Sequence, residues 1–545
     1  MRIVLHARLP AEDAAQRALY AAGGAAPGPS AAGDPVYPGG HFRAEEHAAR
    51  RLKWLDSRPR PADLHEFLRH ENAFAPLAPE QRANLEAAAS PAAVYVLTGQ
   101  QPGLLGGPIL WYYKALTCAA LARTWSRRLK RPVIPVFWAA GDDSDLAECN
   151  HVELPGPEGR EVRGALRLPF PDAARPLAMG ERRIDPGSLS ALLKRLVPAW
   201  GRETVESLGR AYPPPSTLAA GFLRLAQAHL GREGVLFVDG YSRHLRSRAR
   251  PALQRAVDRW EAWQDALARG TAAAAAAGIP VQVEARPNAV HAFALKGGER
   301  RRLFARRAAA EERVYLQEHP DRDVRADLAS VELTHDVFSR PIAADAIFPV
   351  LGHVLGPAEL RYFAQLAPLF LEETGDMPLL QPRMTAAVSP AAAREAFAAQ
   401  GLDLAEAMRY GPSALRARLA DRAWRAHPAQ AALGAATADR WLDGVGRLHE
   451  RHFRDRGPLD RLERTVGAAW KRYLHGLEKA AYAASSPGTE SLFRHLAWLG
   501  NGLGQDRHLG LGSLLHALGR DGFQALRGEL DPLSTELQWV EYDDR

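Results

Sequence analysis

The sequence predicts an α/β protein with a parallel-sheet core, and two features of the chain favour this class. Between residues 91 and 388, short apolar runs bounded by Gly or Pro alternate with amphipathic segments of helix length. This alternation is typical of parallel strands connected by helices. Beyond about residue 390 the strand-like runs nearly disappear and helical periodicity takes over. We therefore predict a parallel-sheet core followed by a helical C-terminal region.

Five buried strands and four helical segments are expected in the core. The predicted strands are AAVYVL (92–97), RPVIPVFWAA (131–140), GVLFVDG (234–240), DAIFPVLG (345–352) and MPLLQPR (377–383). The predicted helices span residues 108–129, 214–231, 243–268 and 356–374.

Three further regions surround or interrupt this core of residues 91–388. Residues 1–90 are rich in Ala, Gly and Pro before turning helical, which indicates an N-terminal helical arm. Residues 154–213 are rich in Pro and Gly, and residues 265–330 contain alternating runs typical of a small antiparallel sheet. We interpret both as insertions into the core.

The C-terminal region, residues 389–545, is predicted to form an antiparallel helical coiled coil whose last segment returns to the core. One apolar stripe recurs every three or four residues, at Leu459, Leu462, Val466, Trp470, Leu474 and Leu477. Residues 436–456 are its expected partner, joined through Gly457 and Pro458. Such a pair commonly associates with a second copy, so we expect a homodimer; the alternative is a helical subdomain packed on its own core.

Composition narrows the function classes. The net charge of +7 comes mainly from Arg, but the basic runs are short and not interleaved with aromatic residues, so no nucleic-acid surface is expected. Two cysteines, Cys118 and Cys149, cannot form a disulfide framework, and the N-terminal residues lack the apolar segment of a signal peptide. No apolar run approaches the roughly 20 residues of a membrane span. We expect a cytoplasmic protein without a membrane partner.

The first candidate site is the turn TGQQPGLLGGP, residues 98–108, between a predicted strand and a predicted helix. Its four glycines would permit close backbone approach, and the free amides of a helix start attract anions. This favours a phosphate or carboxylate cradle at the carboxyl edge of the sheet. A tight turn without a ligand would use the same glycines.

The second candidate site is the acidic segment DDSDLAECNHVEL, residues 142–154, which follows the next strand. Several carboxylates placed together need a cation, which could be a metal, a substrate ammonium or a shared proton. The alternative is that Asp142 or Ser144 caps a helix while the other side chains are solvated. Cys149 beside His151 also raises the hypothesis of a nucleophile and its base.

A third group follows the strand at 345–352, where Gly356 and Pro357 begin a helix. Glu359, Tyr362 and Gln365 are spaced to face that end of the sheet, although the aromatic residues there could simply belong to the core. Arg383 ends another strand and could hold a carboxylate or phosphate. An ordinary surface arginine is the alternative.

Four motifs in order, TGQQPGLLGGP with YYKA behind it, PVFWAAGDDSDLAECNHV, RPIAADAIFPVLGHVLGPAELRYFAQL and MPLLQPRMT, resemble the bacillithiol biosynthesis cysteine-adding (BshC) family. The resemblance implies a Rossmann-like core of the nucleotidyltransferase type with two insertions, a C-terminal coiled coil and homodimerisation. It also implies a ligase that joins the carboxyl group of cysteine to the glucosamine amine of glucosaminyl malate.

The resemblance also implies site residues. Catalytic roles fall on Asp143, Asp145 and His151, and substrate or nucleotide binding on Thr98, Gly99, Gln100, Gln101, Gly103, Gly107, Lys114, Asp142, Asn150, Gly356, Glu359, Tyr362, Gln365 and Arg383. Relatives typically read Glu-Asp-His-Asp where this chain has Asp142 to Asp145, with Ser144 in place of the histidine; His151 is then the nearest substitute.

Because a carboxylate and an amine do not condense unaided, ATP or another nucleotide with Mg²⁺ is the suspected cofactor. The His-x-Gly-His motif of class I aminoacyl-tRNA synthetases is missing, since the corresponding position reads QPGLLGG. Two alternative functions remain open. One is a nucleotide-dependent ligase or nucleotidyltransferase acting on another small substrate. The other is a non-catalytic coiled-coil protein, which salt-dependent nucleic-acid binding would reveal.

Overall fold

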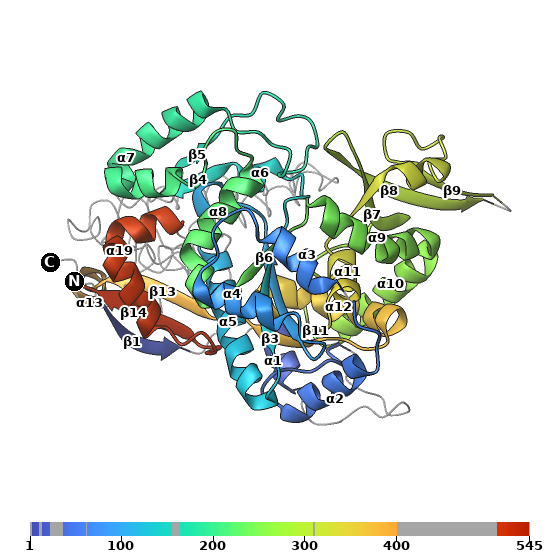
Figure 1. Ribbon diagram of the computed structural model, residues 1–545, viewed down its shortest axis with the longest axis horizontal. Coiled ribbons are helices and arrows are strands. Elements are labelled where there is room, and N and C mark those ends of the chain that lie inside the picture. The colour runs from blue at the N-terminus through green and yellow to red at the C-terminus, as the bar shows by residue number, and fades with distance from the viewer. Residues whose placement is uncertain are drawn as a thin grey trace, which may run out of the picture.

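The computed structural model describes residues 3–9, 14–21, 36–61, 63–154, 164–308, 311–399 and 510–543. A five-stranded sheet lies at its centre, where β3, β6 and β11 are labelled in Figure 1. The strand order is β12–β11–β2–β3–β6, and every neighbouring pair is parallel. The strands are β2 (Val94–Gln100), β3 (Val133–Ala139), β6 (Leu236–Asp239), β11 (Val350–Leu355) and β12 (Leu379–Pro382). The predicted α/β class with a parallel sheet is confirmed.

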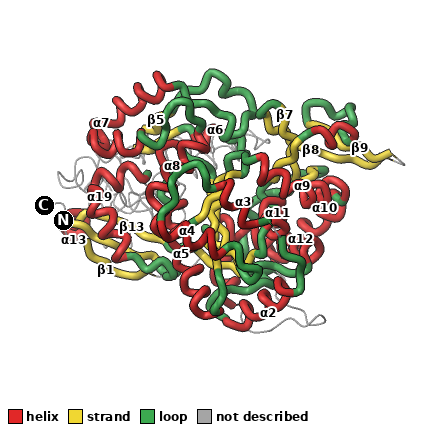
Figure 2. Tube along the Cα trace, in the orientation of Figure 1, coloured by secondary structure: helices red, strands yellow, loops and turns green. Residues whose placement is uncertain are grey.

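Helices surround the strands of the sheet (Figure 2). Alternate residues of the central strands pack into two cores, one on each face of the sheet. Phe137 lies in the core formed with α5 (Leu110–Leu129) and α8 (Leu218–Leu230). Trp138 lies in the opposite core, formed with α3 (Leu64–Glu71), α9 (Arg243–Asp258) and α11 (Ser339–Ile347). Because both faces are covered, the strands are mostly apolar.

One strand begins later than predicted. Residues 345–347 belong to α11, and β11 begins only at Val350. Buried Arg51 donates a hydrogen bond to the carboxylate of Asp345, so this turn of helix is held by a distant partner. Pro349 follows the last residues of the helix and disfavours its continuation.

The two interrupting stretches contain their own elements. In the second, β7 (Ala289–Lys296), β8 (Glu299–Ala308) and β9 (Glu311–Leu316) form an antiparallel sheet with β10 (Glu332–His335), so the predicted antiparallel strands are confirmed. The first contains the hairpin of β4 (His151–Leu154) and β5 (Gly164–Arg167), and then the unpredicted helix α7 (Pro186–Gly209).

A third sheet joins the two ends of the chain, which lie close together in Figure 1. Strand β14 (Leu537–Tyr542) pairs with β1 (Ile3–Leu9) on one side and with β13 (Thr385–Pro390) on the other. Strand β1 was not predicted, because its partner lies at the far end of the sequence. The predicted coiled-coil stripe and its partner helix, and with them the homodimer contact, lie outside the described residues.

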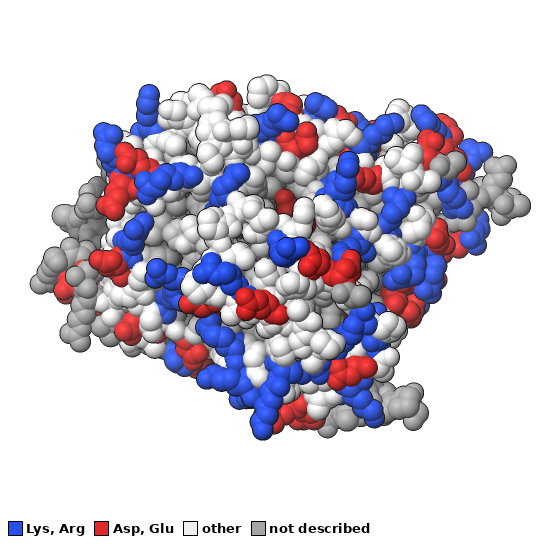
Figure 3. All heavy atoms as spheres, in the orientation of Figure 1, with Lys and Arg blue, Asp and Glu red and all other residues white. Residues whose placement is uncertain are grey.

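The remaining helices complete the layers around the sheets. They are α1 (Ala14–Ala21), α2 (Glu45–Asp56), α4 (Pro79–Ala87), α6 (Leu146–Cys149), α10 (Trp260–Ala276), α12 (Pro357–Thr374), α13 (Ala391–Ala399) and α19 (Leu511–Glu529). Across the described ranges, no helix is both long and apolar enough to cross a membrane. Basic and acidic side chains are interspersed over the face seen in Figure 3.

Candidate active site

The strand order reverses between β2 and β11, which places a topological switch point at the carboxyl edge of the sheet. In open α/β sheets, ligands bind in the crevice outside the strand ends at such a point. Here the two strands are tied together by the Thr98 hydroxyl, which donates to the carbonyl of Val354 at 2.9 Å. The predicted residues Gly99 and Gln100 follow on β2, and Gly356 follows β11.

Lys114 of α5 and Glu359 of α12 meet at this edge. The ammonium Nζ lies 2.6 Å from Glu359 Oε2, 3.0 Å from the carbonyl of Gly99 and 2.7 Å from Gln100 Oε1. Glu359 Oε2 also accepts from the Gly356 amide at 2.7 Å. Burial lowers the pKa of Lys114, and the contact with Glu359 opposes this effect. All three ammonium protons therefore have acceptors, and the pair joins two helix starts.

Arg383, directly after β12, brings a second buried cation to the same place. Its guanidinium donates through Nη1 to the Met384 carbonyl at 2.8 Å and to Thr385 Oγ1 at 3.1 Å. Its Nε has no partner among the residues that the structure describes, although the residue is only 7% exposed. Burial lowers the pKa of Arg383 to about 10. A buried donor without an acceptor is costly, so this position suits an anionic ligand.

Gly356 preserves the space beside these charges. A methyl group in place of its hydrogen would lie 3.4 Å from both Arg383 Nε and Glu359 Oε2, and 3.7 Å from Lys114 Cε. Tyr362, one turn further along α12, accepts a hydrogen bond from Arg340 Nη2 at 3.3 Å, and burial raises the pKa of its hydroxyl to about 12. Among the predicted residues of this third group, Glu359, Tyr362 and Arg383 thus come together.

The acidic segment lies after β3, on the other side of β2. Gln101 donates to Asp143 Oδ2 at 2.9 Å, and Arg300 of β8 donates to Oδ1 at 3.3 Å. Burial alone would raise the pKa of Asp143, but Arg300 and these hydrogen bonds hold it below its usual value. Gln101 also donates to Glu148. Asp143 is therefore a charged, oriented carboxylate at the sheet edge.

Asp142 is more deeply buried, at 1% exposure, and neither of its carboxylate oxygens accepts a hydrogen bond within the described part of the chain. Its Oδ2 lies 3.5 Å from Nε2 of His335, at the end of β10. Burial lowers the pKa of His335 to about 4, so this imidazole is neutral near pH 7. The imidazole paired with the acidic segment is therefore His335, whereas the sequence had suggested His151.

Several predicted residues lie elsewhere. Asp145 caps the short helix α6 by accepting from the Ala147 amide, so a cap does form here, but not at Asp142 or Ser144. Asn150 bonds to the carbonyl of Leu168 and to Arg167 in the β4–β5 hairpin. His151 lines a small cavity with Gly107, Pro108 and Trp200. Gln365 donates to Thr271 Oγ1 and the Val283 carbonyl, against α10 rather than over the sheet edge.

Cys149 does not support the nucleophile hypothesis. The side chain belongs to the main apolar core and is fully buried. Burial, together with nearby Asp143 and Glu148, raises the pKa of the thiol well above its usual value. A reactive cysteine needs the opposite, an accessible site that stabilises the thiolate.

The glycine turn uses the amides of its last three glycines internally. The amides of Gly103, Gly106 and Gly107 donate to carbonyls within the turn itself. A methyl group on Gly99 would lie 2.6 Å from the Trp138 carbonyl, and one on Gly106 would press on Leu511 and Leu225. At Gly99 and Gly106 other parts of the protein approach the backbone closely, and the amides of Gly103, Gly106 and Gly107 already have acceptors within the turn.

Sequence reasoning missed three residues of the site: Arg300, His335 and Arg340. Arg340 is the first residue of the motif RPIAADAIFPVLG. A charged residue directly before a helix-forming run could have indicated a role for it. Arg300 and His335 come from the antiparallel sheet and reach the acidic segment only through folding. No local pattern marks them.

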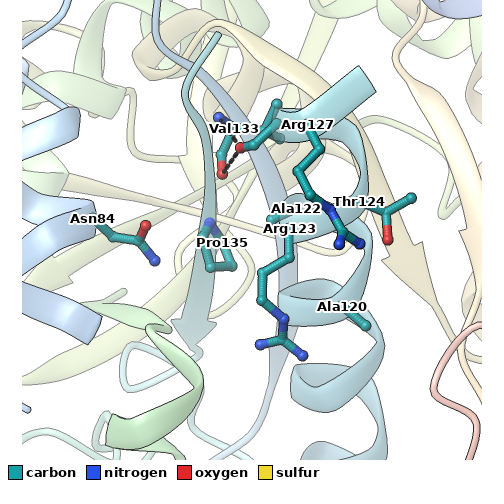
Figure 4. Close-up of a pocket in the computed structure, with 9 residues that line it drawn as sticks. Asn84, Ala120, Ala122, Arg123, Thr124, Arg127, Val133 and Pro135 are labelled. Carbon is teal, nitrogen blue, oxygen red and sulfur yellow. Dashed lines mark hydrogen bonds between the residues drawn. The ribbon is translucent and has the colours of Figure 1, made fainter. Parts of the chain in front are cut away.

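A hollow of about 540 Å³ lies at the opposite, amino edge of the sheet (Figure 4). Arg123 and Arg127 extend from α5 on the same side, close to Pro135 of β3. Arg123 is already paired with Glu233 at 2.9 Å. The buried, incompletely paired charges gather at the carboxyl edge instead, which makes that edge the candidate site.

Comparison with known proteins points the same way. The family described as "Bacillithiol biosynthesis BshC, N-terminal Rossmann-like domain" matches residues 37–384, which include every residue of the site.

Three relatives carry the name "Putative cysteine ligase BshC". The protein of Solibacter usitatus is 30% identical over 396 residues, which cover 71% of this chain and 70% of the relative. That of Geobacillus kaustophilus is 28% identical over 466 residues, 79% and 78% of the two chains. That of Anoxybacillus flavithermus is 28% identical over 335 residues, and the match spans only 61% of that relative's length. With the family match covering most of its length and its Rossmann-like sheet in place, the chain belongs to the BshC family of bacillithiol biosynthesis.

Proposed function

We propose that this protein is a ligase that joins the carboxyl group of L-cysteine to the glucosamine amine of glucosaminyl malate, forming an amide. Family membership supports the reaction class, and one structural observation supports the site. The Nε of Arg383, which has no partner among the described residues, lies beside the Lys114–Glu359 pair at the switch point. Both substrates carry carboxylates, and a buried guanidinium is suited to binding them.

An activating group must also be bound, because the cysteine carboxylate is unreactive towards an amine. The first turn of α12 fits a phosphate better than the glycine turn does. The first intrahelical hydrogen bond of α12 runs from the Leu360 amide to the Gly356 carbonyl. The amides of Ala358 and Glu359 lie before this bond and so have no acceptor within the helix. The buried cations Lys114 and Arg383 lie beside them. A nucleotide, when bound with Mg²⁺, would supply the leaving group.

The acidic side of the edge is suited to the amine. Asp143, charged and fixed by Gln101 and Arg300, can hold a substrate ammonium. The ammonium first gives up one proton to solvent, which frees the electron pair of its nitrogen. As that nitrogen forms its bond to the acyl carbon, the leaving group departs with the electrons of its bond and the nitrogen loses a second proton. Asp142 with neutral His335 offers an acceptor for that proton.

The test is to incubate the purified protein with cysteine, glucosaminyl malate and Mg²⁺, with and without ATP, and to detect bacillithiol by mass spectrometry. We expect product from the wild type and a loss of about 100-fold or more in Asp143→Asn, whose charge is gone. Asp145→Asn is the matched control, because asparagine caps a helix equally well. It should retain activity.

A folded protein that makes no bacillithiol under any condition would refute the proposed reaction. Equal losses of activity in Asp143→Asn and Asp145→Asn would refute the assigned site. The whole acidic segment would then be needed for activity. The dependence on ATP identifies the activating group. Sedimentation of the same preparation measures whether the predicted homodimer forms.

A further inference from the structure

A second cluster of functional groups lies where α3 meets the start of α9, beside the carboxyl end of β6. It consists of His70 and Glu71, the last residues of α3, and His244, in the first turn of α9. Across the described ranges, these are the residues whose His, Cys, Asp or Glu side chains come close enough to share a metal ion. We propose that they form a binding site for a divalent transition metal, of which Zn²⁺ is the best match.

The distances suit one ion. One ligand atom from each side chain lies within 4.8 Å of the other two, and His70 Nδ1 is 3.7 Å from Glu71 Oε1. The two imidazole rings have centroids 3.9 Å apart. Zinc bonds of about 2.0–2.2 Å in a tetrahedron separate ligand atoms by about 3.4 Å. Both imidazoles are exposed, which leaves their rings room to turn towards one ion.

The carboxylate is held in place by groups that do not compete for an ion. Ser242, the N-cap of α9, donates its hydroxyl to Glu71 Oε1, and the Asp239 amide lies 3.3 Å from Oε2. The Glu71 side chain is only 3% exposed, yet no Lys or Arg among the described residues forms an ion pair with it. A buried carboxylate without a cation is unfavourable, and a metal would supply the missing charge.

The backbone carrying these ligands is also fixed. Asn72, next to Glu71, donates to the Phe237 carbonyl at 3.0 Å and accepts from the Phe237 amide at 2.8 Å, which anchors the end of α3 to β6. Outer contacts of this kind orient the ligands of metal sites. Two imidazoles and one carboxylate are a zinc donor set, and three protein ligands leave one coordination position open.

The test measures metal binding by the full chain, independently of activity. Protein freed of metal with a chelator is titrated with Zn²⁺ by calorimetry, and Co²⁺ is added separately to record its absorption bands. We expect the wild type to bind one Zn²⁺ that the double variant His70→Ala/His244→Ala binds at least 100-fold more weakly. His65→Ala, on the same helix but outside the cluster, should bind as the wild type does.

The double variant removes exposed side chains and should fold, which circular dichroism verifies. Glu71→Gln should weaken Zn²⁺ binding and alter the Co²⁺ spectrum, since an amide replaces the carboxylate ligand. Unchanged stoichiometry and affinity in the double variant would overturn the proposal. An equal loss of Zn²⁺ affinity in His65→Ala would also overturn it, because surface histidines in general would then bind the ion.

Discussion

Two strand-to-helix turns, one after β2 and one after β11, lie side by side at the carboxyl edge of the sheet. Their glycines have different surroundings. The turn after β2 contains three glycines, Gly103, Gly106 and Gly107, whose amides donate within the turn, and Leu225 and Leu511 pack closely against Gly106. The turn after β11 has Gly356 alone, with Lys114, Glu359 and Arg383 around it. The contacts around the glycine-rich turn are thus with the protein itself, whereas the turn after β11 lies beside a guanidinium whose Nε has no partner among the described residues.

This difference teaches that glycine content by itself does not locate a ligand. Glycine is required wherever something approaches the backbone closely, and that neighbour can be the protein's own chain. A buried charge without a complete set of partners is the more informative feature, because it costs free energy that only a ligand or function offsets. The following predictions test this distinction.

Arg383→Met should have the largest effect, a loss of ligase activity of about 100-fold or more, because it removes the donor assigned to the anionic substrate. Met keeps most of the side-chain volume, so the fold should persist. The matched control is Arg127→Met, at the hollow on the amino edge. Kinetics of both variants check the assignment: a greater loss in Arg127→Met would move the site to that hollow.

Gly356→Ala should lower activity by about 10-fold to 100-fold while leaving the fold intact, because the added methyl occupies the space beside Arg383 Nε. The backbone there has a φ of −78°, which alanine adopts without strain. Steady-state kinetics together with a thermal melt separate the two effects. A variant that is unstable but fully active per folded molecule would contradict the prediction.

Gly106→Ala should do the reverse and destabilise the protein by about 1–3 kcal/mol, since its φ is +91° and the methyl would press on Leu225 and Leu511. The KM values of the folded fraction should stay unchanged. Urea unfolding measures the first quantity and kinetics at low temperature the second. A selective rise in the KM for a nucleotide would show that this turn binds phosphate after all.

The smallest effect concerns pH. Burial lowers the pKa of His353 to about 3, whereas an unfolded histidine titrates near 6.5. Between these values the unfolded chain binds the extra proton, so stability falls as the pH drops below about 6.5. His353→Leu should reduce this slope by about 1.4 kcal/mol per pH unit. Urea unfolding of both proteins at pH 7, 6 and 5 checks it, and identical slopes would contradict it.

Local pattern predicted much of the fold, and the missed elements share a cause. The strands around 94–100 and 133–139 follow from buried apolar runs bounded by turn residues. Strand β1 was missed because its partner is β14, at the other end of the chain. The shifted start of β11 depends on Arg51 holding Asp345 in a helix. In each case a distant partner decided the local conformation.

The sequence by itself determined the class of sheet, because apolar periodicity and turn residues are read within a few positions. Its motifs also indicated the family, and with it two segments of the candidate site, those containing Lys114 and Glu359. Only the tertiary structure decided which charges share a space. Asp143 accepts a hydrogen bond from Arg300, which is 157 residues away in the sequence, and Asp142 lies next to His335 of the antiparallel sheet. Coulomb and hydrogen-bond energies depend on the distance between two groups in space. The residues next to each group in the sequence do not indicate that distance.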